Sequence, residues 1–187
     1  MNLFGESPKV GDRVTVNGIT FVLIKVIDDG RVVIQQYDNI EDHVFNENNS
    51  NVYEDSDLER YVKEEYPKQF PKEFLSHVEG DFHILSADAY DPDKTEYPFY
   101  KDRRNLTKYD KDGYAISYWT STPYVGVGCL VRYVYPSGLI DISGAYGSNG
   151  VAPACVLNLK SGMDTDRCPG TTLDDIYEIL KEIRDSL

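Results

Sequence analysis

Residues 13–37 read RVTVNGITFVLIKVIDDGRVVIQQY, and this stretch decides the fold of the N-terminal part of the chain. Two runs rich in β-branched residues, Arg13–Val16 and Ile19–Val26, flank the pair Asn17-Gly18. This pair is the strongest short signal for a hairpin, because both residues tolerate positive φ. Asp28-Asp29-Gly30 turns the chain again, and Arg31–Tyr37 follows as a third run. The pattern predicts an antiparallel meander.

The middle of the chain predicts two helices and a strand. Segment 38–54 is rich in Asn and acidic residues, so we expect a solvated loop there. Ser56 and Glu59 have the spacing of a capping box, which predicts that a helix begins near Ser56. Helical spacing of apolar residues predicts a second short helix over 71–78, and the apolar run 82–85 predicts a buried strand.

The second half of the chain returns to a strand pattern. A polar stretch at 91–113 predicts a long loop, and loops of this length in a compact domain are usually functional or mobile. Beyond it, strands are expected over 115–122, 129–135, 139–142 and 151–159, with a glycine-rich connection at 143–150. The sequence therefore predicts an α+β fold, with small twisted antiparallel sheets, flanking helices and long loops.

The chain is expected to form a single domain over 1–160, followed by a linker and a C-terminal helix within 161–187. Thr172 can cap this helix, and its apolar face consists of Leu173, Ile176, Tyr177, Leu180, Ile183 and Leu187. Such a face must be covered. It packs either on the chain's own sheet or on a second copy, and the second case would give a homo-oligomer.

Composition excludes several classes of function. The 187 residues carry 19 Lys and Arg against 32 Asp and Glu, a formal net charge of −13. Direct binding to nucleic acid or to an anionic membrane is therefore not expected. We expect neither a transmembrane segment nor a signal peptide, which predicts a cytoplasmic protein or a component of a phage virion. The cysteines Cys129, Cys155 and Cys168 are expected to be reduced.

Five short blocks of the sequence resemble a family. They are Gly11–Val14, Asp55–Arg60, His83–Ser86, Tyr118–Ser121 and Gly150–Ala154. Because these blocks occur in this order, the chain resembles an uncharacterised bacterial and phage domain family that carries a domain-of-unknown-function label. The resemblance covers roughly residues 8–160. Family members have an Arg at the position of Ala152 and a Leu-Arg pair at Thr120-Ser121. If the family's Arg anchors a ligand or a buried salt bridge, this chain lacks that anchor.

The blocks around Trp119 and Pro153 are also similar to C-type-lectin-like and sulfatase-modifying-factor folds. This resemblance implies a compact α+β domain with long loops on one side. Many such domains present loops to a partner and perform no chemistry. This is an analogy of fold alone.

A catalytic set is not evident in the sequence. Ser121 and Ser143 lie outside any Gly-x-Ser-x-Gly elbow, and no His follows His83. The alternating acids at 91–93 and 110–112 do not continue to the twelfth-position Glu of an EF-hand, so they favour solvated turns over calcium binding. We predict no catalytic residue, no metal and no cofactor. An enzyme of unassigned class remains one alternative.

Aromatic residues gather late in the chain and support two interpretations. The first is a core with scattered surface tyrosines. The second is a ligand-binding patch made of Trp119, Tyr124, Arg132 and Tyr146, because Tyr and Trp bury large areas at small entropic cost. Alternation along 132–135 places Arg132 on the face opposite to Tyr133.

The leading functional hypothesis is a non-enzymatic binding or structural module. It would present the loops 91–113 and 143–150 to a protein or glycan partner. The alternative from a different class is an acidic nucleic-acid mimic that inhibits a DNA- or RNA-binding protein, with the acidic segment 38–65 as its surface.

Overall fold

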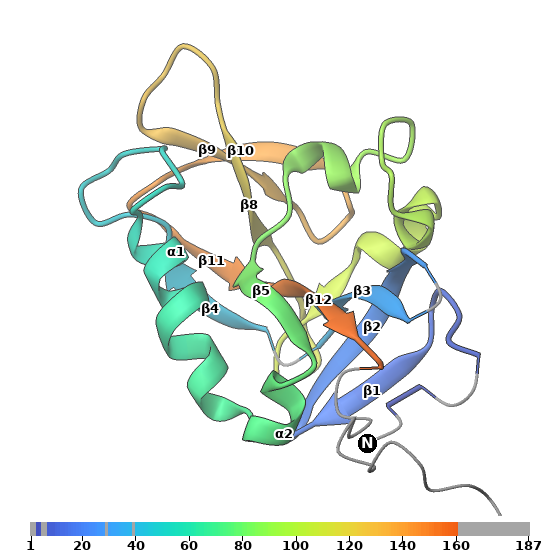
Figure 1. Cartoon of the computed structure of the whole chain (residues 1–187). Helices are drawn as coiled ribbons and strands as arrows, with labels where there is room; N and C mark the ends of the chain where they lie inside the picture. Colours follow the sequence, from blue (N-terminus) through green and yellow to red (C-terminus); the bar gives the residue numbers. More distant parts are fainter. Residues whose placement is uncertain (1–2, 5–6, 29, 39, 161–187) are drawn as a thin grey trace, which may run out of the picture.

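The computed structural model describes residues 3–4, 7–28, 30–38 and 40–160 (Figure 1). Two five-stranded sheets and a two-stranded ribbon form the described part of the molecule. The first sheet has the order β1-β2-β3-β12-β5, and the second has the order β10-β9-β8-β11-β4. All described pairings are antiparallel except β8 with β11. The predicted α+β class with mostly antiparallel sheets is confirmed.

The strands of the first sheet come from the start, the middle and the end of the described chain. They are β1 (Arg13–Val16), β2 (Ile19–Val26), β3 (Arg31–Gln36), β5 (Val78–His83) and β12 (Ala154–Asn158). The predicted meander is confirmed, and Asn17 and Gly18 have φ of 50° and 82° as a two-residue hairpin turn requires. Strand β12 lies between β3 and β5 and pairs with both.

The second sheet contains β4 (Glu41–Val44), β8 (Tyr118–Pro123), β9 (Leu130–Val134), β10 (Ile140–Gly144) and β11 (Ser148–Val151). Strand β4 lies at its edge and pairs only with β11 among the described strands. The expectation of a solvated loop over 38–54 is therefore wrong for residues 41–44. An edge strand with exposed acidic residues gives no apolar alternation, and this hides it in the sequence.

A helical segment runs from residue 57 to 69 and comprises α1 (Asp57–Arg60), the π-helical turn η1 (Tyr61–Glu65) and the 3-10 turn η2 (Tyr66–Gln69). The predicted start is confirmed, since Ser56 Oγ accepts a hydrogen bond from the Glu59 amide at 3.0 Å. The second helix, α2 (Lys72–Leu75), is shorter than expected. Residues from Val78 onward already belong to β5.

The stretch 91–113 is not the exposed excursion that its composition suggests. It contains η4 (Pro98–Lys101), η5 (Arg103–Leu106) and β6 (Lys108–Tyr109), the last paired with β7 (Ala115–Ile116). The 3-10 turn η3 (Ala87–Tyr90) precedes this stretch. Phe99, Tyr100, Leu106 and Lys108 are buried. Apolar residues spaced widely among polar ones escape a search for periodicity, although together they anchor the whole stretch.

Two cores lie on opposite faces of the first sheet. Phe21, Leu23 and Ile34 pack with the helical segment and with Trp119. Val22, Ile24 and Val33 pack with Tyr90, Tyr100 and Tyr118 on the other face. Strands β2 and β3 are thus covered on both sides, which explains why they are continuous apolar runs rather than alternating ones.

The predicted linker and C-terminal helix within 161–187 lie outside the described residues. Among the residues that the structure does describe, no helix has the length and apolar character needed to cross a bilayer.

Candidate binding surface

Trp119, the first residue of the predicted patch, lies in the core. Its side chain is fully buried and its indole Nε1 donates to the His43 carbonyl oxygen at 2.9 Å. The ring makes an edge contact with Phe45 at a centroid distance of 5.4 Å. Trp119 therefore joins β8 to β4. It does not belong to a surface patch in this fold, and this part of the predicted site is corrected.

Tyr124 and Arg132 do come together. The guanidinium carbon of Arg132 lies 5.8 Å from the centre of the Tyr124 ring, a cation–π distance. The two side chains are partly exposed. Ile142, the cross-strand partner of Arg132 on β10, is also exposed, and paired residues of an antiparallel ladder point to the same face. Figure 1 shows this end of the second sheet beside the protruding β8–β9 loop.

Tyr146 lies in the turn between β10 and β11 and is 70% exposed. Its ring lies over Gly144, where a Cβ atom would come within 2.8 Å of it, so a larger residue at position 144 would displace the ring. The neighbouring Ala145 amide donates to the Cys129 carbonyl oxygen at 2.8 Å. This hydrogen bond places the turn next to the β8–β9 loop.

The β8–β9 loop supplies residues that the sequence interpretation missed. Val125 is 86% exposed and Val127 is also exposed, while Val52, at 53%, lies on a neighbouring loop. We call residues 124–130 together with Val52 and Tyr146 the hairpin tip. The sequence does contain a signal for it, because valines occupy a glycine-rich turn where polar residues are the norm.

Asn51 fixes the hairpin tip. Its buried side-chain amide Nδ2 lies 3.2, 3.0 and 3.0 Å from the carbonyl oxygens of Tyr124, Val127 and Leu130. Its backbone amide donates to the Gly128 carbonyl oxygen at 2.8 Å. The loop before α1 and the β8–β9 loop are thereby joined. The exposed valines are held outward on an ordered backbone.

A buried polar network lies on the face of the first sheet that packs against Tyr90 and Tyr100. Gln35 Nε2 donates to the Tyr90 hydroxyl at 2.6 Å, and Gln35 Oε1 accepts from the Tyr100 hydroxyl. Lys108 Nζ donates to the Gln36 carbonyl oxygen at 2.9 Å. Burial lowers the pKa of Lys108 to about 7. Because these groups are enclosed, the network organises the core and does not offer a reaction site.

The acids that were considered for calcium binding serve local structure. Asp91 Oδ1 accepts from the Asp93 amide at 3.1 Å, and Lys94 lies between the carboxylates of Asp88 and Asp91. Asp110 Oδ1 accepts from the Tyr114 amide at 2.9 Å. Within the described segments, no group of three or more His, Cys, Asp or Glu side chains is arranged to hold a metal.

Two of the three cysteines are described. Cys155 is fully buried, and burial raises the pKa of its thiol, so the thiol stays protonated at neutral pH. Cys129 is half-buried within the hairpin tip. Cys168 lies outside the described residues.

Comparison of the chain with protein-family models, with curated proteins and with solved structures gives no match. The resemblance to the bacterial and phage domain family stays a prediction from the five sequence blocks.

Proposed function

We propose that the chain is a non-enzymatic binding module that holds a protein partner at the hairpin tip. The observation that carries this proposal is the exposure of Val125, on a loop whose backbone Asn51 fixes, and of Tyr146, on a turn that the Ala145 amide joins to that loop. Exposed apolar side chains that gather on a surface mark interaction sites. A preformed loop also binds with a smaller loss of conformational entropy than a mobile one.

The composition of the tip favours a protein over a glycan. Sugars stack on flat aromatic rings, whereas the most exposed residue here, Val125, is aliphatic. Tyr146 and the Tyr124–Arg132 pair add the residue types that dominate protein interfaces. A glycan partner would have to rely on the tyrosines alone.

The C-type-lectin-like arrangement belongs to the same proposal. Two mostly antiparallel sheets and a helical segment are features that such a domain shares with this structure. The loops that present the surface are 124–130 and the β10–β11 turn within 143–150. The stretch 91–113, which was also expected to face the partner, packs into the core through Phe99, Tyr100 and Leu106 and is not part of this surface.

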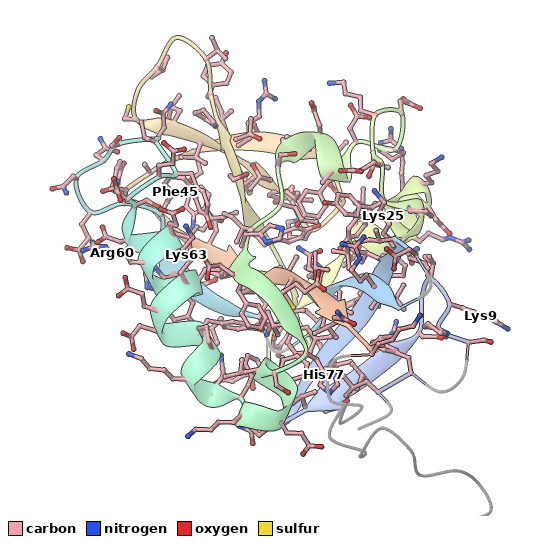
Figure 2. All side chains as sticks on the ribbon, viewed as in Figure 1. Lys9, Lys25, Phe45, Arg60, Lys63 and His77 are labelled. Atoms are coloured by element: carbon pink, nitrogen blue, oxygen red, sulfur yellow. The ribbon has the colours of Figure 1, made fainter. Side chains whose placement is uncertain are left out.

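The nucleic-acid-mimic alternative requires a continuous stripe of free carboxylates over 38–65. In the described structure, Asp57 pairs with Arg60, Glu59 with Lys63, and Glu65 with Lys68. Figure 2 shows Arg60 and Lys63 on the helical segment, within this acidic region. Their charges interrupt the stripe, so the hairpin tip is the better-supported surface.

A display experiment tests the proposal. Random peptide and small-domain libraries would be selected against the full chain, and an array of glycans would be screened in parallel. We expect selected protein binders to lose at least about tenfold in affinity for Val125→Asp, because the charge would be desolvated in the interface. Leu139→Asp is the matched control, since Leu139 is 61% exposed in the β9–β10 turn, outside the tip.

Two results would contradict the proposal. One is a set of binders that Val125→Asp and Leu139→Asp weaken equally. The other is a glycan signal that depends on Val125 in the absence of any protein binder, which would assign the tip to sugars.

A further inference from the structure

A cavity of about 160 Å³ lies away from the hairpin tip, where the β1–β2 turn meets β4 and the helical segment. Its lining residues are Asn17, Gly18, Ile19, Gln36, Glu41, Tyr61, Tyr66, Gln69 and Val151. The volume is several times that of one water and below the roughly 300–1,000 Å³ of pockets for drug-sized ligands. The cavity therefore suits a small chemical group.

Two tyrosines form an aromatic corner in this cavity. The rings of Tyr61 and Tyr66 are 6.4 Å apart and inclined at 63°. His43 stacks on Tyr61 at 4.5 Å and so supports the ring. The Tyr66 hydroxyl donates to Gln36 Oε1 at 2.8 Å, which fixes the other ring. Both tyrosines line the cavity, and the negative face of an aromatic ring attracts a cation.

Glu41 supplies the only formal charge among the lining residues, since none of them is Lys or Arg. It is exposed on edge strand β4 and forms no salt bridge within the described part of the chain. Glu41 pairs with Val151, which also lines the cavity. It lies two residues before His43, whose ring stacks on Tyr61, so strand register places Glu41 on the face of β4 that carries the cavity. Burial raises the pKa of both Tyr61 and Tyr66, and the negative charge of Glu41 acts in the same direction.

The donors that line the cavity are largely engaged. Asn17 Nδ2 donates to the Gln69 carbonyl oxygen at 2.7 Å, and Gln36 Nε2 donates to the Asp38 carbonyl oxygen at 2.9 Å. The Tyr66 hydroxyl is also used. A neutral sugar needs donors as well as acceptors, whereas an ammonium group needs only acceptors and ring faces.

One cation lies behind the cavity. Lys108 Nζ donates to the carbonyl oxygen of Gln36 and is shielded from the cavity by strand β3. Burial lowers the pKa of Lys108 to about 7, so at pH 8 most of its repulsion is gone. The net charge of −13 also raises the local concentration of cations around the molecule.

From this geometry we propose that the cavity binds an organic ammonium group, with Glu41 as the counter-ion and Tyr61 and Tyr66 as the aromatic walls. The ammonium belongs either to a free amine or to a lysine side chain of a partner protein. The site is independent of the hairpin tip.

Titration of the full chain, followed by amide and side-chain NMR shifts at pH 8, tests the proposal. The probes are tetramethylammonium, butylammonium, and a short peptide with one lysine in unmodified and trimethylated form. The neutral isostere 3,3-dimethylbutanol and glucose serve as controls. We expect saturable shifts at Gly18, Gln69 and Val151 with the cations and none with the neutral molecules.

Variants assign the effect to the cavity. Glu41→Gln should weaken binding of the cations about tenfold, because it removes the counter-charge and keeps the shape. Asp42→Asn, which makes the same change on the next residue of β4 outside the cavity lining, should leave binding within about twofold of the wild type. Tyr61→Leu should also weaken binding. Since Tyr61 supports packing, the comparison of Glu41→Gln with Asp42→Asn is the decisive one.

The remaining outcomes are equally informative. A lysine peptide that binds more tightly than the free amines identifies a partner side chain as the source, and equal affinities identify a small amine. The proposal is wrong if the cations give no saturable shifts, if glucose or 3,3-dimethylbutanol bind as well, or if Glu41→Gln and Asp42→Asn behave alike.

Discussion

Lys108 makes the stability of this protein depend on pH in an unusual direction. Its side chain is fully buried among tyrosines, with Nζ 3.3 Å from the Tyr100 hydroxyl and 5.5 Å from the centre of the Tyr118 ring. Burial lowers the pKa of Lys108 from its ordinary value of 10.5 to about 7, and Asp38 offsets part of this effect. Folding thus forces Lys108 to lose its proton near neutral pH.

The sign of the effect follows from proton counts. Between pH 7 and about 10.4 the unfolded chain keeps a proton that the folded chain has released. The unfolded state binds more protons, so the free energy of unfolding rises with pH in this window. The slope approaches ~1.4 kcal/mol per pH unit, and from pH 7 to about 8.5 it sums to about 1.5 kcal/mol.

Other buried groups act in the opposite direction at higher pH. Burial raises the pKa of the Cys155 thiol, so the folded state keeps a proton that the unfolded state loses above about 8.5. Burial also raises the pKa of Tyr53 to about 12, with the same sign of effect above about pH 10. The window from pH 7 to about 8.5 is therefore the one in which Lys108 dominates.

The assay is urea unfolding of the wild type and Lys108→Met at several values of pH within this window. Methionine has a similar length and no charge, so the variant should lose the rise with pH. Any loss of the hydrogen bond to the Gln36 carbonyl shifts its stability by an amount that does not depend on pH. Subtraction of the two curves also removes the contribution of Cys155.

We expect the stability of the wild type relative to Lys108→Met to grow by about 1.5 kcal/mol from pH 7 to about 8.5. A difference that stays constant across the window would refute the reasoning. It would show that the ammonium finds solvent or a counter-charge in the folded state.

Two further predictions concern residues that hold the second sheet. Asn51→Ala should lower the free energy of unfolding by about 2 kcal/mol and speed amide exchange over 124–130, because three carbonyls lose their contact with Asn51 Nδ2, although those of Val127 and Leu130 keep backbone donors. Asn48→Ala, on the same exposed loop, is the control, and unchanged exchange in Asn51→Ala would contradict the role of Asn51. Trp119→Phe should cost about 1–2 kcal/mol in urea unfolding, since it removes the buried indole N–H that donates to the His43 carbonyl oxygen and leaves the core underfilled beside Phe45. A change below about 0.3 kcal/mol would show that water replaces the indole N–H.

The structure brings together part of the patch that the sequence predicted, and the binding of a ligand there stays a prediction. Tyr124 and Arg132 lie in contact, as the predicted patch required, and Tyr146 is exposed near them. Trp119 was misplaced because its chemistry suits a core as well as a surface. Only the position of β4 and Phe45 shows that its ring is enclosed.

The sequence by itself determined the elements whose cause lies within a few residues. Asn17-Gly18 fixes the first hairpin through positive φ, and Ser56 fixes the start of the helical segment through its own hydroxyl. The continuous apolar runs of β2 and β3 likewise require cover on both faces.

Only the tertiary structure decided which chemical groups meet. The hairpin tip depends on Asn51, which contacts carbonyls 73 to 79 residues away. The cavity proposed to bind an ammonium group joins residues as distant as Asn17 and Val151. The position of strand β4 and the packing of the stretch 91–113 also depend on residues that are distant in the sequence. Local turns and caps are set by backbone geometry and near hydrogen bonds, whereas burial and exposure depend on what the rest of the fold places against each side chain.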